Sequence, residues 1–243
     1  MKKVVFLGSK FVGYECLKHL YDQRNRLDLE LIAVLTNLRG KKIIEFCREK
    51  SITIIDNLDE FTNFESCDIA ISVQYHKILK KEHIEKAKEI IINLHIAPLP
   101  EYRGCNQFSY AIINDDKEFG TTIHRLEEGI DSGSIMFEKR FPIPDGCWVE
   151  DLYQIACDQS VVLFQESLLR IISGEYELVP QDSLLSERKT SIHYRKDIND
   201  LKKIDLSWTK EKIERHIRAT YMPGFEHPFA IVNKKKIYFD KET

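Results

Sequence analysis

The first 150 residues alternate between short apolar runs and segments whose apolar residues recur at helical spacing. The apolar runs lie at 3–8, 29–37, 52–56, 67–74 and 89–95. Between them, the segments at 14–23, 41–51 and 80–88 have apolar residues three or four positions apart, which predicts amphipathic helices. Strands that are apolar throughout are buried on both faces. The alternation therefore predicts an α/β fold, a Rossmann-like open and mostly parallel sheet with helices on both faces.

The rest of the chain predicts further helices, two strands and a polar segment. Helices are expected at 105–115 and 149–173, and two strands within 119–143 flank a loop that contains Gly129, Asp131 and Gly133. From Val179 onward the sequence is polar and irregular, up to a helix at 209–219 with Ser207 as its candidate cap. A β-hairpin at 229–239 should turn near Asn233 and Lys234. We predict a catalytic domain at residues 1–178 and a C-terminal extension at 179–243.

Composition and charge exclude several classes of protein. With 43% hydrophobic and 31% charged residues the chain is typical of soluble globular proteins. Its net charge of −3 does not indicate the positively charged surface that binds a nucleic acid. No long apolar stretch predicts a membrane span, and the N-terminus does not have the pattern of a signal peptide. Among the six cysteines no two are closer than ten residues, which argues against a zinc or redox motif. We expect a cytoplasmic protein with no metal site and no membrane partner.

Asn93 and His95 stand two positions apart at the end of the apolar run that contains Ile90, Ile91 and Ile92. Residues two apart in a strand point to the same face. The two side chains should therefore project side by side from the carboxyl end of a central strand, where open α/β sheets bind ligands. The alternative is that both merely cap the strand end through backbone hydrogen bonds.

The segments that follow add chemistry to this strand end. The loop "PLPEYRG" contains two prolines, Arg103 and Gly104, and the helix after it could hold an anion at its N-terminus. The segment "LEEGIDSG" places Asp131 in a glycine-flanked loop. An imidazole as base, an amide as donor to a developing oxyanion and a carboxylate that fixes the imidazole suit acyl transfer to an amine. A serine or cysteine nucleophile, Ser109 or Cys105, is the alternative, although neither lies in a nucleophile-elbow motif.

The stretch "NLHIAPLPEYRG", with "IDSG" placing Asp131 36 residues after His95, resembles the signature of formyltransferases that use N10-formyltetrahydrofolate. This family includes enzymes acting on methionyl-tRNA, on glycinamide ribonucleotide and on amino sugars. The resemblance covers most of residues 1–178. It implies that Asn93, His95 and Asp131 form the catalytic triad: His95 takes a proton from the amine, Asn93 stabilises the oxyanion, and Asp131 orients and charge-balances His95. It also implies N10-formyltetrahydrofolate as cosubstrate.

The C-terminal part suggests the acceptor. "IRATYMPGFEHPFAIVNKKKIYF" resembles the tail of sugar N-formyltransferases that act on dTDP-linked amino sugars. The resemblance implies that Tyr221, ahead of "PGF", stacks on the nucleotide base and that the hairpin contributes to a homodimer. The short extension and the absence of C-terminal repeats favour dTDP-4-amino-4,6-dideoxyglucose, for a lipopolysaccharide or O-antigen. The acidic chain makes tRNA a poor acceptor.

The loop "SVQYHKIL" also resembles that of the sugar enzymes. In the family this loop receives the pterin through backbone groups, which implies cofactor contacts at Ile78 and Leu79, closed on the other side by the backbone around Glu128 and Ile130. A diphosphate requires cations, and Lys77 and Arg103 are the candidates, with Gly104 beside them as a further substrate contact. The expected binding residues are Lys77, Ile78, Leu79, Arg103, Gly104, Glu128, Ile130 and Tyr221.

Other functions remain open at this stage. Glycinamide ribonucleotide or a 3-amino sugar could be the acceptor, or the chain could be a non-catalytic protein that binds a nucleotide sugar or a folate. A nicotinamide-dependent dehydrogenase is disfavoured because "FLGSKFVG" lacks the G-x-G-x-x-G spacing. The second strand also ends in Thr36 and Asn37 rather than in an acid that could hold a ribose.

Overall fold

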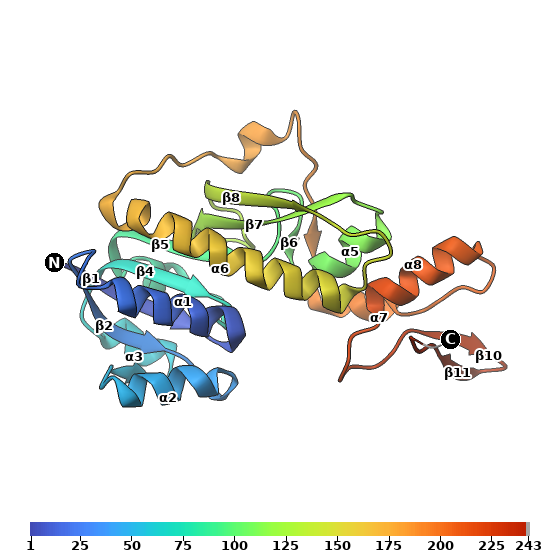
Figure 1. The fold of residues 1–243 in the computed structure, drawn as a ribbon, viewed down its shortest axis with the longest axis horizontal. Coiled ribbons are helices and arrows are strands. Elements are labelled where there is room, and N and C mark those ends of the chain that lie inside the picture. Colours follow the sequence, from blue (N-terminus) through green and yellow to red (C-terminus); the bar gives the residue numbers. More distant parts are fainter. Residues whose placement is uncertain (242–243) are drawn as a thin grey trace.

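A seven-stranded sheet forms the centre of the protein, as seen in a computed structural model that describes residues 1–241 (Figure 1). The strand order is β3-β2-β1-β4-β5-β7-β8. Neighbours from β3 to β5 are parallel, whereas β7 and β8 pair antiparallel. The strands are β1 (Lys2–Gly8), β2 (Leu29–Leu35), β3 (Ile54–Ile55), β4 (Cys67–Val73), β5 (Ala87–His95), β7 (Glu118–Arg125) and β8 (Ile135–Pro142). The predicted Rossmann-like sheet is confirmed.

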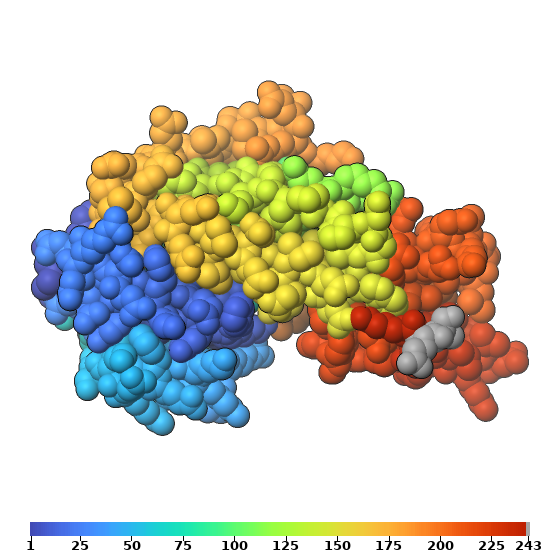
Figure 2. All heavy atoms as spheres, viewed as in Figure 1, coloured from blue at the N-terminus to red at the C-terminus, as the bar shows by residue number. Residues whose placement is uncertain are grey.

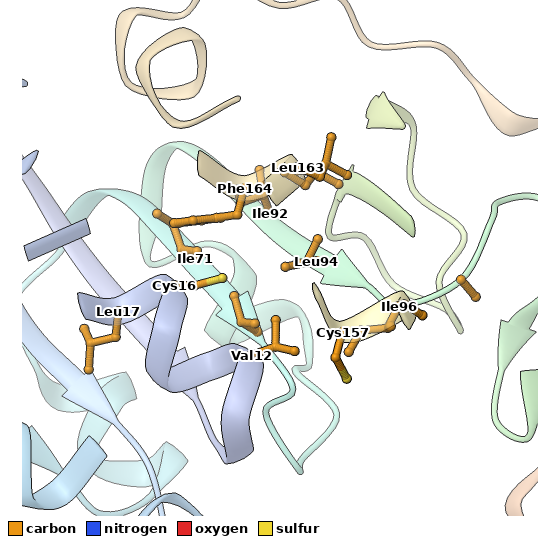
Figure 3. Close-up of a cluster of buried hydrophobic side chains, with 14 of the residues drawn as sticks. Val12, Cys16, Leu17, Ile71, Ile92, Leu94, Ile96, Cys157, Leu163 and Phe164 are labelled. Atoms are coloured by element: carbon orange, nitrogen blue, oxygen red, sulfur yellow. The ribbon is translucent and has the colours of Figure 1, made fainter. Parts of the chain in front are cut away.

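Helices cover both faces of this sheet. One face packs against α1 (Lys10–Gln23), α2 (Lys41–Glu49), α5 (Gln107–Ile113) and α6 (Val149–Ser173). In this layer Ile92 and Leu94 of β5 lie in the same buried cluster as Leu163 and Phe164 of α6 (Figure 3). The other face packs against α3 (Leu58–Asn63) and α4 (Lys81–Ile84). The parallel strands β1, β2, β4 and β5 therefore alternate their side chains between two apolar layers, which explains why these strands are apolar throughout.

Several predicted boundaries differ from the structure. The helix expected at 80–88 is the single turn α4, because the chain from Ala87 onward pairs with β4 instead. The strand expected at 52–56 is reduced to β3, and α1 begins at Lys10 rather than at residue 14. Helix α3 was not predicted, although Asn57 caps it by accepting from the Glu60 amide at 2.9 Å. For α4 sheet pairing, and for α3 a local cap, determines a short element that periodicity alone left ambiguous.

The chain after α6 returns along the β8 edge of the sheet (Figure 1). Helix α6 ends at Gly174, which adopts the left-handed conformation expected of a helix stop. Val179 then bridges to Ile135 of β8, and the turn η2 (Gln181–Leu184) follows. The short strand β9 (Ile192–His193) pairs with β6 (Arg103–Gly104). The segment predicted as irregular is thus hydrogen-bonded to the body of the protein.

The last part of the chain forms a lobe at one end of the molecule (Figure 2). It contains η3 (Arg195–Asp197), α7 (Ile198–Leu201), α8 (Lys210–Thr220) and the hairpin β10 (Phe229–Val232) with β11 (Lys235–Tyr238). The hairpin and its turn at Asn233 and Lys234, both at positive φ, are as predicted. The cap of α8 was predicted wrongly. Thr209 accepts from the Lys212 amide, while Ser207 bonds to Asp205.

Two other sequence predictions concern location and organisation. Within residues 1–241, none of the helices is both long enough and apolar enough to cross a bilayer. The division at residue 178 stays a prediction, although side chains beyond it contact loops that precede it. Elements η1 (Leu38–Gly40) and α2 come after β2 in the chain. Because β1, β2, β4 and β5 are parallel neighbours, their carboxyl ends lie at one edge of the sheet.

Candidate active site

The alternation of β5 places Asn93 and His95 on one face of the sheet. Ile92 and Leu94 point into the apolar cluster beneath α6, so Asn93 and His95 face the opposite way. Asn93 is half-buried and His95 is buried at the last position of the strand. The strand-end arrangement expected from the sequence is therefore present.

The imidazole of His95 is held by a backbone carbonyl. Its Nε2 lies 2.7 Å from the oxygen of Tyr102, and its Nδ1 lies 3.6 Å from Oδ2 of Asp131. Because a carbonyl oxygen only accepts, Nε2 carries the hydrogen and Nδ1 has the lone pair in the neutral ring. The family resemblance implied that Asp131 orients His95, whereas in this geometry the Tyr102 carbonyl orients the ring and Asp131 faces the atom that can take up a proton.

Asp131 lies in the loop between β7 and β8, with a backbone φ of 45°. Its Oδ2 accepts a hydrogen bond from the Gly104 amide at 2.9 Å. Burial alone would raise the pKa of the Asp131 carboxyl, but the positive charge that the His95 and His124 imidazoles acquire on protonation and the Gly104 N–H together lower this pKa well below its ordinary value. The carboxyl is therefore ionised at neutral pH although its side chain is only 20% exposed.

His124 is a further member of this cluster and was not among the residues predicted for the site. The antiparallel pairing of β5 and β7 sets it directly opposite Asn93. Its Nδ1 donates to the Arg125 carbonyl at 2.8 Å, so Nε2 can accept from Nδ2 of Asn93 at 3.2 Å. The same Nε2 lies 3.7 Å from Oδ1 of Asp131. This contact depends on the register between β5 and β7, and the sequence of either strand alone does not predict that register.

The four side chains form a site suited to proton transfer beside a hydrogen-bond donor. The Nδ1 atom of His95 can accept a proton, and the resulting imidazolium would face the Asp131 carboxylate. The amide of Asn93 has two hydrogens, of which one is directed at His124, so the second can donate to a developing negative charge. These are the groups that acyl transfer to an amine needs.

The loop after β4 carries polar atoms without partners. Gln74 Oε1, the Tyr75 hydroxyl and His76 Nδ1 are buried, and none of the three has a hydrogen-bond partner within residues 1–241. In the same loop Lys77 and Ile78 are exposed, whereas Leu79 is buried. Buried polar atoms of a native protein are normally paired, so this loop is suited to a ligand rich in hydrogen-bonding groups.

The other predicted binding residues lie in two places. Glu128 and Ile130 are exposed in the loop that carries Asp131, and Nε of Arg103 lies 3.4 Å from the Asp131 carbonyl oxygen. Gly104 contacts the triad directly through its amide. The helix expected to bind an anion, α5, has only seven residues, and Arg103 precedes it by four positions.

Tyr221 lies at the end of α8 among aromatic rings. Its ring centroid is 5.7 Å from that of Trp148 and 4.5 Å from that of His227. The half-buried Tyr221 is therefore part of a small aromatic cluster between the start of α6 and the segment that precedes the hairpin.

This chain is similar in sequence and in fold to known proteins. Residues 41–168 match the formyl transferase family. The chain is 28% identical over 223 residues to GDP-perosamine N-formyltransferase of Brucella melitensis biotype 1, covering 88% of this chain and 83% of that protein. It is 31% identical over 197 residues to methionyl-tRNA formyltransferase of Kosmotoga olearia, covering 74% of this chain and 62% of that protein.

A solved structure is similar over nearly the whole chain. It is the crystal structure of WlaRD, a sugar 3N-formyl transferase, in the presence of dTDP and 5-N-formyl-THF. The TM-score is 0.79 at 29% sequence identity, and the match covers 98% of this chain and 85% of that one. The likeness therefore includes the C-terminal extension and is not confined to the sheet.

The lowered pKa of Asp131 predicts how stability depends on pH. An aspartate in the unfolded chain has a pKa of about 3.9, so below about pH 4 the unfolded chain binds a proton that the folded protein does not. The contribution is therefore complete above about pH 5 and is lost as the pH falls further. Urea unfolding should show that the free energy of unfolding of the native protein falls relative to that of Asp131→Asn between about pH 5 and pH 3. A difference that stays constant over this range would contradict the assignment.

Proposed function

The chain belongs to the formyl transferase family, and on this basis we propose that it transfers a formyl group from N10-formyltetrahydrofolate to the amine of a nucleotide-linked amino sugar. One observation carries the proposal. Asn93, His95 and Asp131, which come from one strand and a distant loop, converge at the carboxyl end of β5 with His95 Nδ1 facing the carboxylate. This is the arrangement that the family resemblance assigns to the catalytic triad.

Each residue has a role that its contacts support. The Tyr102 carbonyl keeps hydrogen on Nε2 of His95, so Nδ1 takes the proton that the attacking amine releases. Asp131, ionised and 3.6 Å away, stabilises the positive charge that His95 then carries. Asn93 donates its free N–H to the oxygen on which negative charge develops. His124 fixes which end of the Asn93 amide faces the reaction, because its Nε2 accepts the other N–H.

The cosubstrate would bind against the loop after β4. A folate has a polar heterocycle that needs several hydrogen bonds, and the unpaired buried atoms of Gln74, Tyr75 and His76 fit such a group. Backbone groups of Ile78 and Leu79 on one side, and of Glu128 and Ile130 on the other, would enclose it. When bound, N10-formyltetrahydrofolate supplies an activated formyl carbonyl at the triad.

The acceptor would lie toward the C-terminal lobe. The aromatic cluster of Tyr221, Trp148 and His227 offers a surface for a nucleotide base, and Lys77 and Arg103 are the cations for a diphosphate. The named relatives include a GDP-perosamine enzyme and a sugar 3N-formyl transferase crystallised with dTDP. Within this class we propose dTDP-4-amino-4,6-dideoxyglucose, for a surface polysaccharide such as an O-antigen, with a dTDP-linked 3-amino sugar as the alternative that the second relative favours.

The remaining proposals concern assembly and location. Ile231, Ile237 and Tyr238 of the hairpin are 47%, 52% and 47% exposed, although a two-stranded hairpin is marginal without a surface to cover its apolar side chains. We propose that a second copy of the chain covers them in a two-fold homodimer. The substrates are cytoplasmic metabolites, so a cytoplasmic location without membrane or nucleic-acid partners accords with the proposed reaction.

The first prediction of the proposed function concerns the triad. His95→Asn should lower kcat by roughly 10² to 10⁴, because it removes the general base, and Asn93→Ala by roughly 10² to 10³, because it removes an oxyanion donor. The assay follows formyl transfer to a dTDP-linked amino sugar by mass spectrometry. His19→Asn, on α1 and outside the site, is the matched control and should retain full turnover. Near-normal rates for both site variants would exclude the proposed centre. A folded wild-type protein that binds both substrates without turnover would be a binding protein.

The second prediction concerns the nucleotide. Tyr221→Ala should weaken dTDP binding by about 1–3 kcal/mol, the range measured for aromatic stacking on bases, and leave folate binding unchanged. Calorimetric titration with dTDP alone, and separately with 5-formyltetrahydrofolate, measures both. Tyr176→Ala, a half-buried tyrosine after α6, is the control. An unchanged dTDP affinity would show that Tyr221 only packs against Trp148 and His227.

The third prediction concerns the amine position. We expect kcat/KM for the dTDP-linked 4-amino sugar to exceed that for its 3-amino isomer at least tenfold, about 1.4 kcal/mol of transition-state stabilisation. Discrimination should come from pocket shape, because His95 can deprotonate an amine at either carbon. GDP-perosamine and glycinamide ribonucleotide complete the panel of acceptors. A preference for the 3-amino sugar would reassign the acceptor, and a preference for glycinamide ribonucleotide would remove the sugar from the proposal.

A further inference from the structure

Gln181 connects the C-terminal extension to the loop that carries Asp131. It is the first residue of η2 and its side chain is buried, with 4% exposed. Its amide nitrogen Nε2 donates to the carbonyl oxygen of Asp131 at 2.8 Å and to that of Gly133 at 2.8 Å. The Gln181 side chain, 50 positions after Asp131 in the chain, thus pairs with the backbone carbonyls on either side of Ser132.

The orientation of the Gln181 amide follows from these two contacts. Two carbonyl oxygens require donors, so the NH2 end must face them. The other end, Oε1, is buried without a hydrogen-bond partner among residues 1–241. The amide therefore donates to both carbonyls while its own oxygen, Oε1, stays unpaired. If the side chain were removed, each carbonyl would lose the hydrogen bond that Gln181 donates.

The loop that Gln181 holds has an unfavourable backbone conformation. Asp131 has a φ of 45°, in the left-handed region that residues with a side chain seldom adopt. At Gly133 a Cβ would lie 1.9 Å from the Arg125 carbonyl oxygen, so the loop is tightly packed against β7. Such a conformation persists only where surrounding contacts determine it, and Gln181 supplies two of them.

We propose that Gln181 is a positioning residue for Asp131. This inference rests on the proposed function, in which Asp131 stabilises the charge on His95. The line of contacts runs from the Gln181 amide to the Asp131 backbone, and from the Asp131 carboxylate to the Gly104 amide and His95. Gln181 itself touches no reacting group; it sets the conformation from which the carboxylate reaches the imidazole.

The same extension holds the other loop of the site. Ser191 Oγ donates to the Glu101 carbonyl, the Arg103 amide donates to the Ser191 carbonyl at 3.0 Å, and the Cys105 amide donates to the His193 carbonyl at 2.9 Å. At Gly104, which donates to Asp131, a Cβ would lie 2.2 Å from the His193 oxygen. Residues 181–193 therefore hold both partners of the contact between Gly104 and Asp131, and Gln181 is the side chain that acts on Asp131.

The first test is kinetic. Gln181→Met keeps the length of the side chain and removes both donors. It should lower kcat by up to about a hundredfold, which is the effect expected when a catalytic group is displaced by about 1 Å. The KM values for both substrates should stay within about twofold of the wild-type values. Gln154→Met is the matched control and should keep wild-type kinetics, because Gln154 is exposed on α6 and its side chain donates to the exposed Asp158. An unchanged kcat, or a loss confined to KM, would overturn the proposal.

A double-mutant cycle separates positioning from general loss of structure. If Gln181 acts through Asp131, Gln181→Met should change kcat by less than about twofold when it is made in an Asp131→Asn background. A residue that only stabilises the fold would cost the same factor in both backgrounds. Equal factors would therefore contradict the role assigned to Gln181.

A third measurement needs no turnover and so distinguishes failure of this inference from failure of the proposed function. The Gly104 amide donates to Asp131 Oδ2, so its ¹H and ¹⁵N chemical shifts report whether the carboxylate is in place. In Gln181→Met these shifts should move toward those of Asp131→Ala, and in Gln154→Met they should not move. Gln181→Glu, which has the same shape but presents acceptors to both carbonyls, serves as the second variant should Gln181→Met not fold. Wild-type Gly104 shifts in a folded Gln181 variant would refute the proposal whatever reaction the protein catalyses.

Discussion

The two-residue repeat of β5 is the constraint on which the site depends. The alternate side chains Ile90, Ile92 and Leu94 are buried in the cluster beneath α6, so the strand cannot slip by one residue without exposing that core. The burial of these aliphatic side chains thereby fixes Asn93 and His95 on the opposite face. The antiparallel pairing with β7 then determines that His124 lies opposite Asn93. The hydrophobic core and the candidate site are specified by alternate positions of the same nine-residue strand.

The extension beyond residue 178 contributes to the site as well as to a separate lobe. Arg188 donates to the Leu99 carbonyl and pairs with Glu138, while Ser191 and His193 bond to the loop around Gly104. These are polar contacts between segments that have no apolar periodicity. They explain why a segment predicted as irregular is held in a defined place: its side chains and its backbone, including the short strand β9, pair with the backbone of the loops that precede α5.

The sequence predicted those features that repeat locally and missed those that depend on distant contacts. Asn93 and His95 could be placed on one face because strand periodicity is a local property. Asp131 could be considered with them only as a carboxylate in a glycine-flanked loop, and the family resemblance was needed to assign it to the triad. His124 depends on the register of β5 with β7, and Gln181 on a contact between segments 50 positions apart. The same limit applied to the α8 cap, where Ser207 and Thr209 are equally suitable residues and only the geometry chooses Thr209.

The buried carboxylate of Asp131 explains why these residues act together. An ionised group in a buried position is costly unless it is paired and hydrogen-bonded; here the Gly104 N–H donates to it, and His95 and His124, which pair with it when protonated, lie 3.6 and 3.7 Å away. Removal of one partner leaves the charge with fewer contacts, and the remaining groups then relax away from the geometry that the reaction needs. The local backbone at Asp131 is itself unfavourable, so its conformation depends on contacts from outside the loop. Substitutions in this cluster should therefore be strongly non-additive, because each one disturbs the same carboxylate.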